Sequence, residues 1–91
     1  MKKKRNRLEI ISDILEIIRE HSNSIKPTPL LRFSNMSTQG FEEYYRELLE
    51  KGFIREEYDK KGRKFITLTA KGFAFLQKYR AIIGFIEEFE L

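Results

Sequence analysis

Basic side chains gather at two places in this sequence of 91 residues, and clusters of this kind attract phosphate groups. The first seven residues hold five of the 18 basic residues: Lys2, Lys3, Lys4, Arg5 and Arg7. The second cluster surrounds Gly62 and consists of Lys60, Lys61, Arg63 and Lys64. Beyond the first seven residues the chain has 13 basic and 14 acidic residues, so the net charge of +4 comes from the N-terminal segment. This distribution favours a polyanionic ligand; a solvated tail and lysine protection of a strand edge are the alternatives.

A third set of side chains with hydrogen-bonding chemistry lies on a helix predicted over residues 38–51. Ser37 is placed to cap this helix, and the spacing of Phe41, Tyr45 and Leu48 is that of a buried face. The remaining faces carry polar side chains: Thr38, Gln39, Glu42, Glu43, Arg46 and Glu50. Glutamine pairs with adenine, arginine with guanine or phosphate, and threonine with a phosphate or a thymine methyl group. Carboxylates near phosphates cost affinity, although glutamate accepts from cytosine N4, and a scaffold helix with a solvated acidic face is the alternative.

The side chains needed for catalysis or metal binding do not occur in a usable combination. The sequence contains one histidine, His21, and no cysteine, so it offers no zinc ligand set and no nucleophile–base pair. Glu42 and Glu43 are adjacent on a helix and diverge by about 100°, which excludes an acid–base pair between them. The glycines are scattered rather than grouped into a phosphate-binding loop. We therefore expect a protein that is not an enzyme and that needs no cofactor or metal.

The periodicity of the apolar residues predicts three helices, a hairpin and a fourth helix. In the short second helix, Thr28 is the expected N-cap and Pro29 the first helical residue. In the hairpin, Gly62 suits a positive φ, and Thr69 is placed to cap the last helix. The predicted helices span residues 7–21, 29–33, 38–51 and 70–89, and the predicted strands span residues 53–58 and 64–68.

This order of elements predicts a mainly α fold with a small β-hairpin: a winged helix-turn-helix with three helices, a two-stranded wing and an added C-terminal helix. The length suits one domain over residues 1–91. Within it we expect a flexible basic arm at residues 1–6, a winged-helix core at 7–69 and a long dimerisation helix at 70–91. The sequence has no apolar run long enough to span a membrane, and the lack of cysteine is typical of a reducing interior, so we expect a cytoplasmic protein.

The last predicted helix carries more apolar side chains than a small three-helix domain can cover. Leu76 and Ile83 share one heptad position, and Tyr79 and Ile86 share another. The pattern predicts a homodimer through six side chains: Leu76, Tyr79, Ile82, Ile83, Ile86 and Phe89. Burial against the first helix of the same chain is the alternative, and the acidic residues near the C-terminus disfavour a membrane surface.

Runs of residues along nearly the whole chain resemble the small archaeal winged helix-turn-helix proteins. This group includes dimeric ten-kilodalton DNA-binding chromatin proteins with a C-terminal coiled-coil helix. The resembling segments are residues 5–11, 13–15, 26–28, 34–37, 48–54, 68–72, 75–76 and 79–80. The Leu-Thr-x-Lys-Gly step at 68–72 is common in winged helices, so it is the order of all the segments that carries the resemblance.

The resemblance implies a homodimer that binds DNA as a regulator or as a chromatin protein of the nucleoid. By position, the start of the helix that would enter the groove matches Thr38, Gln39, Glu42 and Glu43, and the wing loop matches residues 60–64.

Our hypothesis from the sequence is therefore the binding of double-stranded DNA. In it, the arm (Lys2, Lys3, Lys4 and Arg5) and the wing cluster (Lys60, Lys61, Arg63 and Lys64) contact phosphates. The candidate residues on the helix are Ser37, Thr38, Gln39, Glu42 and Arg46, with any sequence preference coming from Thr38, Gln39 and Arg46. The main alternative is a protein-interaction module whose acidic helix is the contact face and which does not bind DNA. RNA binding is disfavoured because the aromatic residues sit at core spacings.

Overall fold

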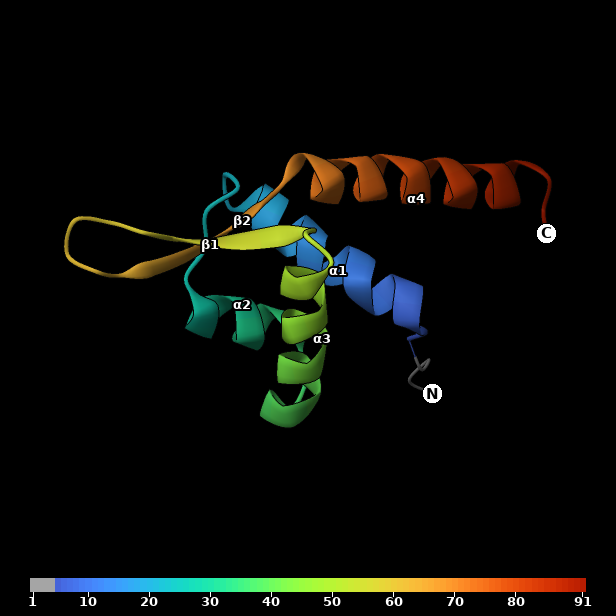
Figure 1. Cartoon of the computed structure of the whole chain (residues 1–91). Helices are drawn as coiled ribbons and strands as arrows, with labels where there is room; N and C mark the ends of the chain where they lie inside the picture. Colours follow the sequence, from blue (N-terminus) through green and yellow to red (C-terminus); the bar gives the residue numbers. More distant parts are fainter. Residues whose placement is uncertain (1–4) are drawn as a thin grey trace.

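The computed structural model describes residues 5–91 and shows four helices and one β-hairpin (Figure 1). The elements are α1 (Arg7–Glu20), α2 (Pro27–Ser34), α3 (Thr38–Glu50), β1 (Ile54–Tyr58), β2 (Lys64–Leu68) and α4 (Ala70–Glu88). The strands pair antiparallel, with Ile54 opposite Leu68 and Tyr58 opposite Lys64. We refer to β1, β2 and the loop at residues 59–63 as the wing. The predicted fold class, three helices and a two-stranded wing followed by a long helix, is confirmed.

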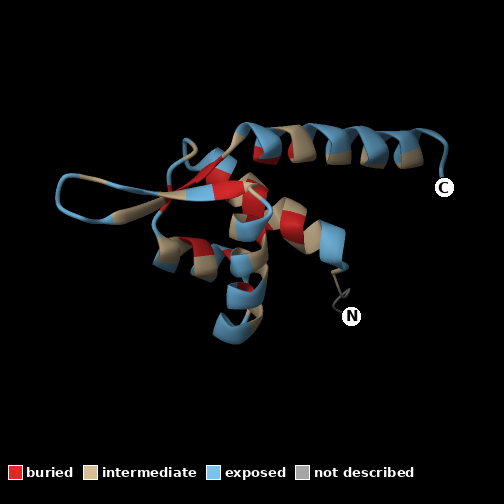
Figure 2. Cartoon of the chain, in the orientation of Figure 1, coloured by how far each residue is buried: buried red, intermediate tan, exposed pale blue. Residues whose placement is uncertain are grey.

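The hydrophobic core lies where α1 meets α2 and the strands, and Figure 2 shows the buried residues concentrated there. α1 contributes four buried side chains spaced three and four residues apart: Ile11, Ile14, Leu15 and Ile18. These side chains share one cluster with the fully buried Leu30 of α2, Leu48 of α3 and Ile66 of β2. Because α3 and β2 are packed into the same cluster, burial of apolar surface fixes their relative position.

The ends of the elements follow the local signals in the sequence. The hydroxyl groups of Ser37 and Thr69 accept hydrogen bonds from the third backbone N–H of α3 and α4, at 3.1 and 3.2 Å. Gly52, which follows the C-cap of α3, has φ of 76°, and Gly62 in the wing loop has φ of 79°. Both values lie in the region that glycine adopts without steric cost. These predicted caps and turns are confirmed.

The start of α2 differs from its prediction. The helix begins at Pro27, so its N-cap is Lys26, which makes no side-chain hydrogen bond, and Thr28 is not the cap. The first four N–H groups of a helix have no partner within it, so prolines at both Pro27 and Pro29 fit the first turn. The sequence pattern could not separate the two prolines because either one meets this condition.

α4 packs against the domain with its first half only. Leu76 is 2% exposed and belongs to the core, and the Phe75 ring contacts those of Phe53 and Tyr79. The second half extends away from the other elements (Figure 1), leaving Ile82 and Phe85 more than half exposed. The assignment of Leu76 to a dimer surface is therefore corrected, because its side chain is already buried within its own chain.

The first turn of α4 is held against the segment that joins α3 to β1. The Thr69 hydroxyl donates to the carbonyl oxygen of Gly52 at 2.5 Å, and the Thr69 N–H donates to that of Phe53 at 3.1 Å. Gly72 faces the same carbonyl so closely that a Cβ there would overlap the Phe53 oxygen. The absence of a side chain at Gly72 therefore permits the approach of α4 to the domain.

We predict that Gly72→Ala lowers the free energy of unfolding by about 1–3 kcal/mol, because the added methyl group forces backbone apart. Urea unfolding followed by circular dichroism would measure the loss. Gly84→Ala is the matched control: a Cβ at Gly84 meets nothing within 4 Å, so this change should stabilise the helix by up to about 1 kcal/mol. Equal effects of the two substitutions would contradict the close contact at Gly72.

Candidate nucleic-acid interface

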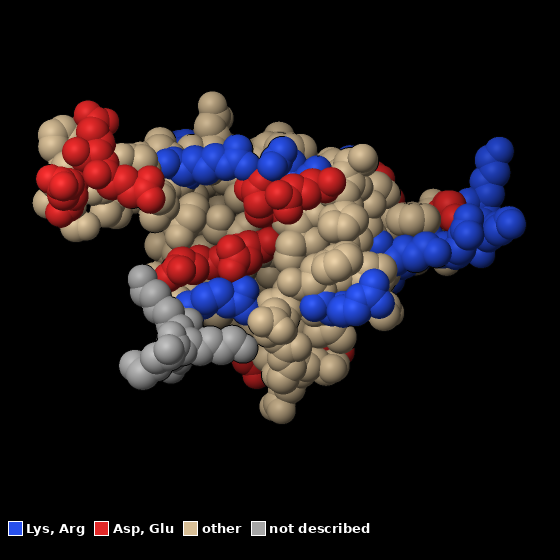
Figure 3. Space-filling view, turned by 180° about the vertical axis from the view of Figure 1, so that it is seen from behind, with Lys and Arg blue, Asp and Glu red and all other residues tan. Residues whose placement is uncertain are grey.

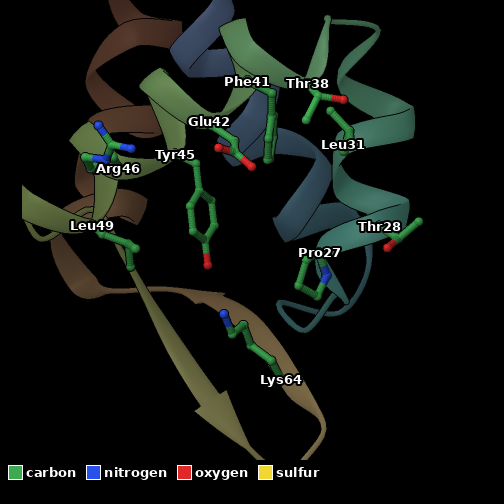
Figure 4. Close-up of a pocket in the computed structure, with 10 residues that line it drawn as sticks. All are labelled: Pro27, Thr28, Leu31, Thr38, Phe41, Glu42, Tyr45, Arg46, Leu49 and Lys64. Atoms are coloured by element: carbon green, nitrogen blue, oxygen red, sulfur yellow. The ribbon is translucent and has the colours of Figure 1, made fainter.

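A concave surface that encloses about 410 Å³ lies between α2, α3 and the wing (Figure 4). Its apolar part includes Leu31, Phe41 and Leu49. Of the predicted site residues, the structure brings four together on its lining: Thr38, Glu42 and Arg46 from α3 and Lys64 from β2. The remaining two predicted residues of this helix region, Ser37 and Gln39, are exposed beside it.

Tyr45 links α3 to the wing across this concave surface. Its hydroxyl donates a hydrogen bond to the Glu56 carboxylate on β1, which also pairs with the Lys64 ammonium on β2 at 3.3 Å. Figure 4 shows the Tyr45 hydroxyl and the Lys64 amine pointing toward each other from α3 and β2. The hydrogen bond from Tyr45 lowers the pKa of Glu56, while burial and the same hydrogen bond raise the pKa of Tyr45. The three groups thus form a charged link between helix and wing.

Helical spacing predicts Tyr45 as a core residue and does not reveal this hydrogen bond. The available signal was the choice of tyrosine rather than phenylalanine at a buried helix position, since a partly buried tyrosine hydroxyl usually finds a partner. Its partner lies 11 residues away on another element, which helical spacing does not reveal.

The wing loop is organised by Asp59. Its carboxylate accepts hydrogen bonds from the backbone N–H groups of Lys61 and Arg63, both at 2.9 Å, and pairs with the Arg63 guanidinium at 2.6 Å. These contacts, led by the backbone N–H of Arg63, lower the pKa of Asp59. Arg63 is consequently engaged within the loop, although it remains exposed.

Two cations of the wing are left without such a partner. Within residues 5–91, no carboxylate forms a salt bridge with Lys60 or Lys61, and both side chains are exposed. Figure 3 shows the basic side chains at the wing end of the molecule and acidic side chains at the opposite end, where α4 ends. The predicted wing cluster therefore divides into two free lysines and two paired cations.

The basic arm is only partly described. Lys2, Lys3 and Lys4 lie outside the described residues, so their predicted role stays a prediction. Arg5 differs from the expected flexible arm: its guanidinium pairs with Asp13 at 2.8 Å and donates to the carbonyl oxygen of Ser34 at 2.9 Å. This carbonyl belongs to the last residue of α2, where a helix favours a nearby cation. Asn6 is likewise ordered as the N-cap of α1.

One of the carboxylates of α3, Glu47, is neutralised by nearby cations. Glu47 pairs with Arg7 of α1 and with Lys51 at 2.7 Å, so this acidic side chain fastens α3 to α1. Among residues 5–91, Glu42 and Glu43 form no ion pair. The negative charge of Glu47 is therefore offset, whereas those of Glu42 and Glu43 are retained.

Residues 5–91 contain no group of three or more histidine, aspartate or glutamate side chains arranged to hold a metal ion. None of the helices formed by these residues is long and apolar enough to span a lipid bilayer.

The helix-turn-helix of α2 and α3 with the adjacent wing defines the class of the domain as a winged helix-turn-helix. The model of the winged helix-turn-helix family matches residues 4–87, and the chain belongs to this family. No curated protein matches the chain.

Three solved structures show how widely this fold is shared. Sso10a-2, a DNA-binding protein from Sulfolobus solfataricus, has a TM-score of 0.74 and 21% identity, over 94% of this chain and 86% of its own. F-93 of SSV1 has a TM-score of 0.65 and 23% identity, over 94% and 99% of the two chains. A MarR-family transcriptional regulator from Silicibacter pomeroyi has a TM-score of 0.63 and 19% identity, over 76% of this chain and 47% of its own. At these identities the similarity establishes the fold.

We predict that Tyr45→Phe lowers the free energy of unfolding at about pH 7 by roughly 1 kcal/mol, because Glu56 loses a hydrogen bond. The pKa of Glu56 in the folded protein lies below its ordinary value of 4.5, so ionised Glu56 stabilises the fold at pH values above 4.5. This contribution is lost as the pH falls through the pKa of the folded state. The difference between wild type and variant should therefore shrink on acidification. Urea unfolding across a pH series would measure it.

Tyr44→Phe serves as the control for this experiment. Tyr44 is the neighbouring tyrosine on α3, and within the described residues its hydroxyl forms no hydrogen bond with another side chain. If both substitutions cost the same at every pH, the link through Glu56 does not hold helix and wing together.

Proposed function

We propose that the protein binds double-stranded DNA as a homodimer and acts as a transcriptional regulator or nucleoid-associated protein. One observation carries the proposal. The exposed, polar face of α3 occurs together with two wing-tip lysines, Lys60 and Lys61, that form no ion pair in the described chain. Membership of the winged helix-turn-helix family supports it. So do the descriptions of similarly folded proteins as DNA-binding or as transcriptional regulators.

In this proposal α3 is the helix that enters the major groove. An α-helix with its side chains is about 10–12 Å across, which fits a groove about 12 Å wide. The exposed residues Thr38, Gln39 and Arg46 then face base edges and phosphates. Phe41 and Leu48 stay buried and hold the helix against the domain.

The wing supplies the sequence-independent part of the affinity. Lys60 and Lys61 contact phosphates directly, because no carboxylate of the described chain competes for them. Arg63 and Lys64 contribute less, because Asp59 and Glu56 already offset their charges. The number of phosphate contacts per protomer is consequently smaller than the basic residues of the loop suggest.

Dimerisation is proposed through the projecting half of α4. Ile82, Phe85 and Phe89 are each more than half exposed there. Tyr79, Ile83 and Ile86 are half-buried along the same helix. A single helix with this much exposed apolar surface gains stability when a second copy covers it.

We predict that log affinity for a random-sequence duplex falls linearly with log salt, because each phosphate contact releases counterions. Lys60→Ala and Lys61→Ala should each make this slope shallower by about 0.9 for every phosphate that the variant no longer neutralises. The effect should be equal for different sequences, because phosphates carry no base information. Fluorescence anisotropy with labelled duplexes across a salt series measures both quantities.

Lys78→Ala is the charge-matched control, since it removes one exposed lysine from α4 rather than from the wing. An identical change of slope in the control would show that only net charge matters. If the wild type binds no duplex even at low salt, the protein-interaction module becomes the better description.

We predict that the double substitution Ile82→Asp and Phe85→Asp halves the mass measured by sedimentation equilibrium. Both side chains are more than half exposed in one chain, at 56% and 57%, so circular dichroism should report an intact fold. Leu8→Asp is the control, because Leu8 is an exposed apolar residue on α1, at 52%. An unchanged mass of the double variant would exclude the α4 interface.

A further inference from the structure

Glu42 contributes a carboxylate to the concave surface between α2, α3 and the wing. Three other carboxylates of α3 and the wing are held: Glu47 by Arg7 and Lys51, Glu56 by Tyr45 and Lys64, and Asp59 by Arg63. Within residues 5–91, no cation forms a salt bridge with Glu42. Arg46, one helical turn further along α3, lines the same surface and is also free of ion pairs in the described chain.

If α3 enters the major groove as proposed above, the Glu42 carboxylate is brought among phosphates that repel it. This cost is offset only where the carboxylate accepts a hydrogen bond from a base. The major groove offers two such donors, the amino groups of cytosine N4 and adenine N6. Adenine presents its N7 acceptor beside the amino group, and this lone pair repels a carboxylate, whereas cytosine presents the donor alone.

Arg46 has the complementary chemistry. A guanidinium donates two hydrogen bonds to O6 and N7 of guanine, the commonest specific contact in protein–DNA complexes. Residues four apart on a helix lie on one side and about 6 Å apart along its axis, which corresponds to about two base-pair steps. A cytosine and a guanine read by this pair would therefore lie within about two base pairs of each other.

We propose that Glu42 and Arg46 determine sequence preference, with Glu42 accepting from cytosine N4 and Arg46 donating to a nearby guanine. The inference rests on the proposed DNA binding. Glu42 then has two opposing effects on DNA binding. Its carboxylate weakens binding to every sequence because phosphates repel it, and its hydrogen bond offsets this loss only at sites with cytosine in the matching position. Glu42 is thus a specificity-determining residue rather than a residue that adds affinity.

Glu43 provides an internal control on the same helix. It is also exposed and without an ion pair among the described residues, but it does not line the concave surface. Adjacent residues on a helix diverge by about 100°, so Glu43 points away from the direction of Glu42. The two carboxylates share charge and solvent exposure and differ in direction.

The test begins with selection of bound sequences from a random duplex library by the wild type, Glu42→Ala and Glu43→Ala. Fluorescence anisotropy then measures the affinity of each protein for the selected duplex and for a duplex in which the C·G pair is changed to T·A. The wild type should select cytosine with a guanine within about two base pairs and discriminate the two duplexes by about 5- to 100-fold. Glu42→Ala should bind random DNA more tightly than the wild type and lose this discrimination. Glu43→Ala should keep it.

The outcomes separate the inference from the function on which it rests. The role of Glu42 is overturned if binding is salt-sensitive but the preference for cytosine survives in Glu42→Ala. It is also overturned if the wild type binds DNA without any preference for cytosine. Both results leave the proposed function intact. Failure of the wild type to bind any duplex at low salt overturns both. Circular dichroism of each variant verifies that a lost preference does not come from a lost fold.

Discussion

A charged link from Tyr45 through Glu56 to Lys64 connects α3 to the wing outside the hydrophobic core. Leu48 of α3 and Ile54 of β1 are buried in the common core, which fixes the end of the helix and the start of the strand. The wing extends beyond that core, and a two-stranded hairpin alone is marginally stable in water. The link holds the exposed part of the wing beside α3, so that the lysines of the loop and the polar face of the helix can act on one ligand.

The ion pairs that order the wing also offset part of its positive charge. Asp59 shapes the loop by holding Arg63, and Glu56 anchors the strand by holding Lys64. Each ion pair between exposed groups adds little stability by itself, but it removes a cation from those that can bind phosphate. If the protein binds DNA as proposed, a surface with few free cations and the Glu42 carboxylate would give weak sequence-independent binding, and base contacts would decide where the protein binds.

Local signals made most of the fold predictable, and long-range contacts account for the differences. Capping hydroxyls such as Ser37 and glycines such as Gly62 act within a few residues, so the sequence shows their role directly. Arg5 was expected to be flexible because its partners, among them the Ser34 carbonyl, become neighbours only after folding. Likewise the partner of the Tyr45 hydroxyl stands on a strand. The residues of the candidate site could therefore be proposed from the sequence. Which of its charged side chains remain free of ion pairs could not.

α4 combines two environments along one helix, and periodicity alone could not separate them. Leu76 has the heptad spacing of a dimer residue, yet it lies where the helix still contacts the core, and its burial there excludes a second use. Gly72 permits that contact, since the backbone at Phe53 leaves no room for a Cβ. Beyond the core, Ile82 and Phe85 remain more than half exposed in the described chain. The acidic residues of this end lie far from the basic wing (Figure 3). In the proposed dimer, a second copy bound to the projecting half of α4 would therefore bring two wings together while keeping these acidic side chains away from the phosphates that we propose the wings contact.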